Sequence, residues 1–500
     1  MINYRFGLKD AVHFTFITFA LVMFGLLAGK YYLKGQAGEL NIRPVRLAGL
    51  TSRSDWYGVY FQDRKIGYSN FTVEPQDSLL VLTDRTFLSF TMIGQPQKVD
   101  TYLRAVTDDS LALVSFVFSL RGEDTRFGLR GRVEDDELVL SITTAGETRI
   151  ERIGLEEPPH LPGTVQLLLA DLQLEAGKRF SIQVFDPASL ANMPLEIEVA
   201  GRDTIEHGGL SVPVWHMRQN MAGMLVDTYL DDTGRTIEER SRIGYRLVLE
   251  TEEEARAGSR SGQAADLNQL VSIAVDRPLP SPRTISRLTV QFEGLDGDTL
   301  GLSGGVQSYR DGVLEIVAAA LPPEGSELDT VPTAILEDFT TPSLFVQSEH
   351  PRLLALAAGI VNLNDGPVEK VRSIVGWLGA NITKKPTFSI PNTLEVMERR
   401  SGDCNEFAVL FCSLARAAGI PARIAMGLVY LEGAFYYHAW DECFIDGFWV
   451  PVDPVFGQFP ADATHLRMIA GDMDRQVEIL PLVGSLGISV IDWEQAPGAF

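Results

Sequence analysis

The sequence predicts an α+β chain with three parts: an apolar N-terminal helix, a large antiparallel β domain, and a C-terminal core with one helix packed on an antiparallel sheet. Three observations support this. Residues 11–29 are apolar and uncharged. Between about Trp56 and Glu250 the apolar residues alternate with a period of two. From Arg399 to Gly457 one helical pattern precedes three strand patterns.

Length and composition exclude several classes of protein. A chain of 500 residues is too long for one ordinary domain. Its 43 basic and 66 acidic residues give a net charge of −23. This charge repels phosphate backbones and anionic lipids, so we expect no nucleic-acid partner and no broad basic membrane-binding surface. The three cysteines form neither a disulfide framework nor a zinc pattern, and we expect no metal and no other cofactor.

The run Ala11–Gly29 is long enough to cross a bilayer, because 19 helical residues approach the ~30 Å of the hydrocarbon core. A buried helix and a cleaved signal peptide are the alternatives, but no clear small-x-small cleavage site follows the run. We therefore predict that residues 1–34 form a short tail and an uncleaved anchor.

The orientation of this anchor rests on two opposed arguments. The flanking positive charges alone lean against export of the C-terminal bulk. A short tail before a single span is, however, the usual layout of a signal-anchor. We predict a single-pass protein of the inner (cytoplasmic) membrane, held by residues 11–29, with a periplasmic or other extracytoplasmic body.

Residues 50–250 are predicted to form the antiparallel β domain, because short strands recur with turn signals every 8–12 residues. The segment contains no catalytic spacing. It is therefore interpreted as a scaffold or a ligand-binding surface, with an envelope protein as its candidate partner. The expected strands are Trp56–Tyr60, Ile66–Val73, Leu79–Leu82, Tyr102–Val106, Leu111–Leu120, Phe127–Val133, Leu138–Ile142, Phe180–Phe185, Leu195–Val199, Val212–Met217, Met224–Leu230 and Arg246–Glu250.

Prolines mark the boundary that follows this domain. Residues 251–284 are predicted to be a linker that includes Pro278, Pro280 and Pro282. Residues 285–341 form a β-rich connecting region, with strands expected at Ser286–Phe292 and Leu314–Ala318. Residues 342–494 form the catalytic domain, where helical spacing appears at Leu353–Val361 and Val368–Asn381.

A cysteine occupies the start of the most informative helix. Asp403 and Glu406 have the spacing of a capping box, which makes Cys404 the first helical residue. At that position the helix dipole and the unpaired N–H groups favour a thiolate. Cys412 lies two turns further along the helix and is interpreted as a core residue.

Three strands follow this helix, at Ala422–Leu431, Ala434–Ile445 and Phe448–Pro454. The dipeptide Asp446–Gly447 favours a two-residue hairpin turn. The resulting register places His438 diagonal to Asp453 on one face of the sheet. Cys443 is an odd number of residues from His438, so it points to the other face.

These positions suggest nucleophilic catalysis, with Cys404 as the nucleophile, His438 as the general base and Asp453 as the residue that orients the imidazole. Backbone N–H groups at the helix start, that of Cys404 among them, would hold an oxyanion. The residues alone leave a structural role equally open, because a cysteine or histidine in apolar surroundings is more often part of the core.

The same stretch resembles the transglutaminase-like superfamily, within the papain-like cysteine enzymes. Four motifs carry the resemblance: RxGxCxEFA at 400–408, RAxGIPAR at 416–423, HAWxE at 438–442 and WxxxDP at 449–454. It covers about residues 342–494 and implies Cys–His–Asp roles for Cys404, His438 and Asp453. Strands at Val477–Leu480 and Ile488–Ile491 would fit that fold. The segment at 56–68 is also similar to the start of β domains that precede such domains in bacterial envelope proteins.

The resemblance implies a membrane-anchored, cysteine-dependent acyl-transfer enzyme. It would hydrolyse or transamidate amide bonds of protein or peptide substrates in the cell envelope. We favour hydrolysis, because water is abundant in an open cleft. The alternative is a catalytically silent binding or assembly module.

Overall fold

The computed structural model describes most of the chain from Gly38 onward. The described residues are 38–39, 51–92, 95–122, 126–144, 146–170, 174–187, 190–221, 223–258, 272–295, 300–321, 332–362, 364–387 and 389–496. The predicted membrane span at 11–29 lies outside these ranges. Within them, no helix has both the length and the apolar character needed to cross a bilayer.

The chain divides into two compact units, and the break between them falls after Leu267. The first contains the described residues 38–258 and the second those from 272 to 496. The break lies inside the segment 251–284 that the sequence suggests as a linker.

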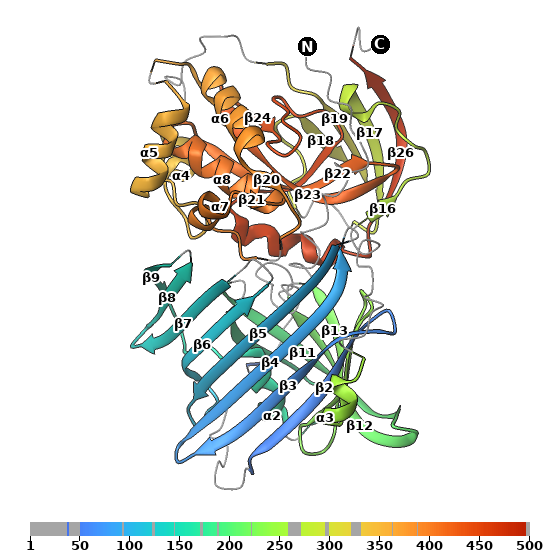
Figure 1. Ribbon diagram of the computed structural model, residues 1–500. Coiled ribbons are helices and arrows are strands. Elements are labelled where there is room, and N and C mark those ends of the chain that lie inside the picture. Colours follow the sequence, from blue (N-terminus) through green and yellow to red (C-terminus); the bar gives the residue numbers. More distant parts are fainter. Residues whose placement is uncertain are drawn as a thin grey trace. The chain divides into compact units, whose positions relative to one another are not determined.

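The first unit is built on one 15-stranded sheet, which twists strongly along its length (Figure 1). Every neighbouring pair of strands is antiparallel except β1 with β10. The strand order is β1-β10-β11-β12-β13-β14-β15-β2-β3-β4-β5-β6-β7-β8-β9. The strand bounds are β1 Gly38–Glu39, β2 Arg53–Phe61, β3 Arg64–Gln76, β4 Leu79–Met92, β5 Gln95–Thr107, β6 Leu113–Arg121, β7 Arg126–Glu134, β8 Glu137–Thr144, β9 Glu147–Gly154, β10 Arg179–Asp186, β11 Ala191–His207, β12 Leu210–Met221, β13 Met224–Leu230, β14 Thr236–Ser241 and β15 Tyr245–Glu250.

The large antiparallel sheet is confirmed, and most strands extend beyond the predicted bounds. Five elements of this unit were not predicted: strands β1, β9 and β14, the helix α2 at Pro162–Ala170 and the short helix α3 at Glu252–Arg256. Strand β9 alternates half-buried and exposed residues and has no buried position, so its apolar signal is weak. Helix α2 is short and mostly apolar, and periodicity cannot classify such a run.

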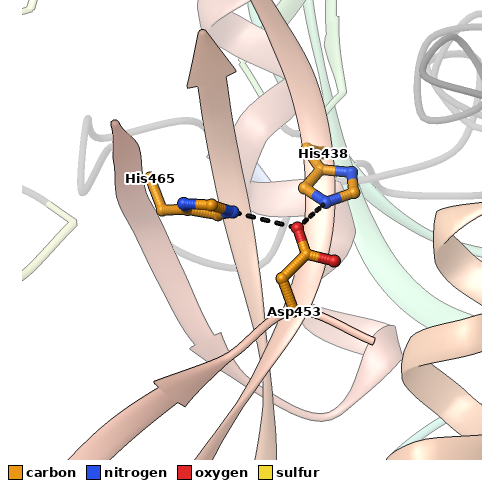
Figure 2. A group of neighbouring side chains, drawn as sticks. All are labelled: His438, Asp453 and His465. Atoms are coloured by element: carbon orange, nitrogen blue, oxygen red, sulfur yellow. Dashed lines mark hydrogen bonds and ion pairs between the residues drawn. The ribbon is translucent and has the colours of Figure 1, made fainter. Parts of the chain in front are cut away.

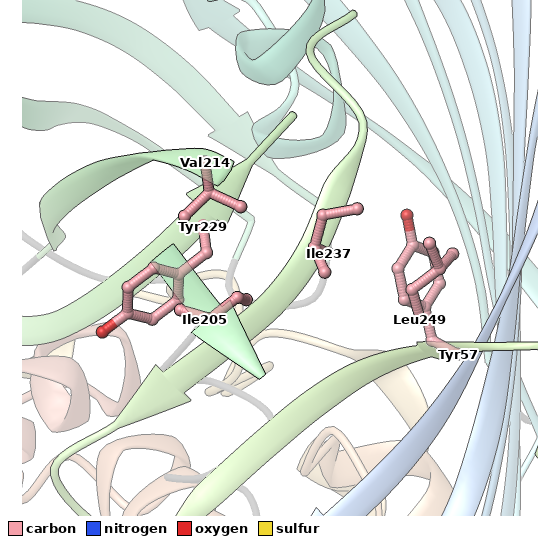
Figure 3. Packing of buried hydrophobic residues seen from close by; sticks show 6 residues of the cluster. All are labelled: Tyr57, Ile205, Val214, Tyr229, Ile237 and Leu249. Atoms are coloured by element: carbon pink, nitrogen blue, oxygen red, sulfur yellow. The ribbon is translucent and has the colours of Figure 1, made fainter. Parts of the chain in front are cut away.

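A hydrophobic cluster joins six strands of this sheet (Figure 3). Tyr57 on β2 and Leu249 on β15 lie beside Ile237 on β14. The other three members are Ile205 on β11, Val214 on β12 and Tyr229 on β13. Alternate side chains of a strand share one face, so a period of two in the sequence is sufficient to build this cluster. A short helix, α3 at Glu252–Arg256, follows β15 and packs on β2.

The second unit contains two sheets and a group of helices. A four-stranded sheet has the order β18-β19-β17-β26, and a five-stranded sheet has the order β16-β23-β22-β25, with β24 paired to β23. The two-stranded ladder β20-β21 is separate. The strand bounds are β16 Ser272–Ala274, β17 Ile285–Glu293, β18 Gln307–Arg310, β19 Val313–Val317, β20 Thr383–Lys384, β21 Ser401–Gly402, β22 Ala422–Leu431, β23 Ala434–Ile445, β24 Phe448–Val452, β25 His465–Gly471 and β26 Gly487–Gln495.

Helix α8, Cys404–Ala417, is central to this unit, and its residues from Cys404 to Arg416 are all buried. It packs on β22 and β23 on one side and contacts α5, α6 and α7 on others. The remaining helices are η4 Pro282–Thr284, α4 Thr333–Thr340, α5 Pro351–Ile360, α6 Pro367–Asn381, α7 Thr393–Arg399 and the 3₁₀ segment η5 Met473–Leu482.

The predicted helices α5, α6 and α8 and the hairpin strands are present, although β24 ends at Val452 rather than Pro454. The strand predicted at Val477–Leu480 is wrong, because these residues lie in η5. A four-residue alternation is too short to separate a strand from a 3₁₀ helix. Strand β25 was not predicted, and it proves to carry a residue of the candidate site.

Candidate functional site

The start of α8 is held by the predicted capping box. The Asp403 side chain accepts a hydrogen bond from the backbone N–H of Asn405 at 3.0 Å, and Glu406 Oε2 accepts one from the N–H of Asp403 at 3.0 Å. The Ser389 hydroxyl donates to Glu406 from the preceding loop. These bonds satisfy donors that a helix start leaves unpaired, and they fix Cys404 as the first helical residue.

One edge of β23 has two separate strand partners, and the stretch between them lies beside this helix start. One edge of β23 pairs with β16 at residues 434–436 and with β24 at residues 441–445. Between them, at residues 437–440, no described strand occupies that edge. The backbone N–H of Ala439 in this stretch hydrogen-bonds the Cys404 thiol. The thiol therefore lies against the strand edge, next to the residue that follows His438.

The hairpin register agrees with the prediction. Asp441 pairs with Val452 and Ile445 with Phe448, around a turn in which Asp446 has a positive φ of 53°. His438 Nε2 lies 2.9 Å from Oδ2 of Asp453, the first residue after β24 (Figure 2). The structure thus places the imidazole and the carboxylate as expected, in direct contact.

The Asp453 carboxylate is held from several sides. Its Oδ1 accepts hydrogen bonds from the backbone N–H groups of Val455 at 2.8 Å and Phe456 at 2.9 Å. Burial alone would raise the pKa of Asp453, but the hydrogen bonds and charges of His438 and His465 outweigh it and hold this pKa far below its ordinary value. Asp453 is therefore ionised at any pH near neutrality.

His465, at the start of β25, is the second histidine on this carboxylate, and the sequence analysis missed it. Its Nε2 lies 2.9 Å from the same Oδ2 of Asp453 that contacts His438 (Figure 2). No motif contains His465, and its strand was not predicted. The only available signal was a histidine among apolar residues, which by itself more often indicates a core position.

The expected thiolate at Cys404 is not supported by the surroundings of the thiol. Burial raises the pKa of Cys404 well above its ordinary value, and the carboxylates of Asp403 and Glu406 add to this effect. The hydrogen bond from Ala439 acts in the opposite direction but is weaker. The capping residues that position the cysteine are themselves acidic, so they disfavour the negative charge that the helix start would favour.

The other two cysteines lie apart from His438. Cys412, on α8, contacts the carbonyl oxygen of Ala422 at 3.5 Å, and burial raises its pKa above the ordinary range. Cys443 pairs with Ala422 and Val450 inside the sheet and lies near Asp441 and Cys412. Both thiols are fully buried, in agreement with the interpretation of Cys412 as a core residue.

One group of ligand-type atoms has a spacing that would fit a metal ion. The atoms come from His438, Asp453 and His465 and lie within 4.8 Å of one another. The Nε2 atoms of His438 and His465 are both at hydrogen-bonding distance from Oδ2 of Asp453, so the contacts within the group already satisfy these three atoms. We therefore assign the three residues to a hydrogen-bonded chain and not to a metal.

A helix that begins at a cysteine, packed on a sheet that carries a bonded histidine–aspartate pair, is the arrangement of papain-like cysteine enzymes. Residues 354–454 match the family model of the transglutaminase-like superfamily, so the chain carries a transglutaminase-like domain. The matched range includes Cys404, His438 and Asp453 but ends before His465. A comparison with curated proteins gave no match.

Three solved structures are similar to parts of the chain. A candidate cysteine protease from Cytophaga hutchinsonii has 18% identity over 45% of this chain and 86% of its own, with a TM-score of 0.28. The periplasmic domain of TgpA from Pseudomonas aeruginosa, solved with ethylmercury, has 18% identity over 35% of this chain and 91% of its own, with a TM-score of 0.23. A β-barrel-like protein of Brucella abortus has 14% identity over 39% of this chain and 94% of its own, with a TM-score of 0.32.

Proposed function

We propose that the C-terminal unit is a cysteine-dependent acyl-transfer enzyme that acts on amide bonds, with Cys404, His438 and Asp453 as its catalytic residues. The bond between His438 and Asp453, next to the strand edge that receives the Cys404 thiol, is the observation that carries this proposal. All three side chains are fully buried, so their contacts are not screened by solvent.

The reaction starts from a neutral pair. Burial raises the pKa of the Cys404 thiol and lowers the pKa of His438, so proton transfer is coupled to attack and does not precede substrate binding. Nε2 of His438 contacts Asp453, which leaves Nδ1 as the nitrogen that accepts the thiol proton.

The thiolate sulfur then forms a bond to the amide carbonyl carbon. The backbone N–H of Cys404, at the start of α8, stabilises the oxyanion. The C–N bond breaks as the imidazolium returns its proton to the departing amine, and a thioester remains on Cys404. Attack by water regenerates the thiol and releases a carboxylic acid, whereas attack by a second amine forms a new amide. We favour water as the acceptor.

Protein or peptide amides in the cell envelope are the proposed substrates. Residues 11–29 are proposed to anchor the chain in the inner membrane with its body exported, and the β domain to bind an envelope partner. A reporter fused after Phe500 tests the orientation. Reporter activity on the cytoplasmic side alone would contradict the export of the body, and a shortened N-terminus would contradict the anchor.

A catalytically silent binding module is the second candidate. The observation that favours it is the complete burial of Cys404, His438 and Asp453, because a substrate reaches such residues only after the surrounding chain moves.

Turnover decides between the two candidates. Activity-based profiling of envelope extracts first selects an amide substrate, and hydrolysis of that substrate is then compared for the wild type, Cys404→Ala and Cys412→Ala. The enzyme proposal expects that Cys404→Ala abolishes turnover and that Cys412→Ala retains it. Cys412→Ala is a matched control, because both thiols are buried on α8. Equal turnover of Cys404→Ala and the wild type would exclude Cys404 as the nucleophile.

A further inference from the structure

His465 lies at the centre of a buried chain of hydrogen bonds. Its Nε2 lies 2.9 Å from Asp453 Oδ2, and its Nδ1 lies 3.1 Å from the carbonyl oxygen of Asp462 and 3.5 Å from Asp462 Oδ1. Only 3% of the His465 surface is exposed. The two ring nitrogens of His465 thus contact two aspartates, Asp462 and Asp453, and Asp453 also contacts His438.

The far end of this chain is also anchored. Arg283 Nη1 lies 2.9 Å from Asp462 Oδ2, and the Thr464 hydroxyl and backbone N–H donate to Asp462 Oδ1 at 2.5 and 2.8 Å. The Arg283 guanidinium also lies 4.4 Å from the centre of the Phe456 ring. Asp462 is therefore fixed as a hydrogen-bond and charge partner of His465, and the order of contacts is Arg283–Asp462–His465–Asp453–His438.

Charged and aromatic groups surround the two imidazoles. The charged groups with the largest effect on His465 are Asp462 and Asp453, and those with the largest effect on His438 are Asp453, His465 and Arg283. The Trp440 ring lies 6.0 Å from the His438 ring and 5.3 Å from the His465 ring, so an aromatic side chain packs against both histidines.

The contacts favour a charged His465. Burial alone would lower its pKa, but the two aspartates outweigh burial and raise the pKa of His465 to about 9. His438 has the opposite behaviour: burial lowers its pKa, and the His465 and Arg283 charges add to this although Asp453 opposes it. These contacts thus favour a cationic His465 and a neutral His438 on the two sides of one carboxylate oxygen.

We propose that His465 is a positioning residue of this site, which holds the Asp453 carboxylate against His438 and, by its positive charge, keeps His438 neutral and able to accept the Cys404 proton. This deepens the proposed function and rests on the roles assigned there. His465 acts through Asp453 and does not contact the reacting atoms.

The charge and the hydrogen bond of His465 can be separated by substitution. Glutamine keeps an N–H donor for Asp453 but carries no charge, so His465→Gln removes a positive neighbour of His438. We expect the pH at which His438 becomes neutral to rise by about half a unit to one unit, and the acidic limb of kcat/KM to move with it. His465→Leu removes the hydrogen bond as well, and we expect kcat to fall at least tenfold further.

The alkaline limb of the profile of kcat/KM against pH provides a second readout. Wild-type His465 loses its proton near pH 9. A change in kcat/KM near that pH is therefore expected in the wild type and should be absent in His465→Gln. A purely structural role of His465 would change the melting temperature or the amount of folded protein, but it would not move these limbs.

The deciding experiment follows the His438 ring by NMR in histidine-labelled full-length protein that carries Cys404→Ala, with and without His465→Gln. It needs no turnover, so it separates this inference from the proposed function. His216→Gln is the matched control, because His216 contacts Asp227 at 2.6 Å in the β domain. An unchanged His438 titration in folded His465→Gln protein would overturn the inference. A shifted titration, together with no amide turnover by the wild-type protein, would support the inference and contradict the enzyme.

Discussion

A Cβ atom added to Gly402 would lie 2.3 Å from the Cβ of Glu406, which is closer than real Cβ contacts come. Gly402 ends β21, two residues before α8, and Glu406 completes the capping box that places Cys404 at the helix start. The glycine is therefore required by close packing.

We expect Gly402→Ala to displace Glu406, destabilise the protein by about 1–3 kcal/mol and reduce turnover, because the helix start that carries Cys404 moves. Denaturant unfolding and kcat measure the two effects. Gly359→Ala is the control: Gly359 is exposed on α5, its added Cβ would meet nothing within 4 Å, and alanine is favoured in helices. Wild-type stability and turnover of Gly402→Ala would refute the packing argument.

His438 and Asp453 are expected to act as one catalytic unit, and replacing His438 is expected to reduce turnover more than replacing Asp453. His438→Ala should lose as much turnover as Cys404→Ala, because no base remains for the neutral thiol. Asp453→Asn should lose up to about 10⁴-fold, as in serine triads, yet retain a measurable remnant. The double variant should be no worse than His438→Ala alone. Kinetics on one amide substrate test this prediction, and losses that multiply would contradict it.

A melting curve must accompany the Asp453→Asn measurement. The carboxylate accepts from Val455 and Phe456 through Oδ1 and contacts His438 and His465 through Oδ2. The amide nitrogen of asparagine cannot accept, so one pair of donors loses its acceptor. We expect destabilisation of about 1–3 kcal/mol, which must be distinguished from the catalytic loss.

Alkylation of Cys404 is expected to be slow at neutral pH. Burial and the Asp403 carboxylate raise the pKa of the thiol, so little thiolate exists at pH 7 and the rate should rise with pH well above the range of a free cysteine. The iodoacetamide rate against pH, with a Cys412→Ala/Cys443→Ala background to isolate Cys404, measures this. Rapid labelling with a plateau below pH 7 would instead show that the helix dipole dominates.

The sequence was sufficient for the features of the site that local rules determine. The spacing of Asp403 and Glu406 predicted where α8 begins, and Asp446–Gly447 predicted the register that joins His438 to Asp453. Both depend on residues close in the chain, where capping and turn chemistry decide the geometry.

The features that the sequence did not predict depend on distant parts of the chain. His465 reaches Asp453 because β25 pairs with β22, and Arg283 reaches Asp462 from a segment 179 residues earlier. The raised pKa of the Cys404 thiol follows first from complete burial and then from the neighbouring Asp403 carboxyl group. The helix dipole was visible in the sequence, but the burial that opposes it was not.

Two neighbouring glutamates on β14 are expected to change stability with opposite dependence on pH. Burial, together with the charge of Asp84, raises the pKa of Glu239 to about 7, although a hydrogen bond with Gln166 opposes this. Burial also raises the pKa of Glu238, but Arg240 and Arg246 outweigh it and hold that pKa below its ordinary value.

The sign of each effect follows from the folded and unfolded pKa values. The pKa of Glu239 is raised in the folded state, so the contribution of Glu239 to stability is present below its ordinary pKa of 4.5 and is lost as the pH rises through about 7. Glu239→Gln should therefore stabilise the protein above pH 7, by about 1–2 kcal/mol, and have little effect near pH 4. The pKa of Glu238 is lowered in the folded state, so Glu238→Gln should destabilise the protein at pH 7. This destabilisation should diminish as the pH falls below 4.5. Urea unfolding of both variants from pH 3 to pH 8 measures the two slopes. Slopes of the same sign would show that the charges around β14 are not arranged as described.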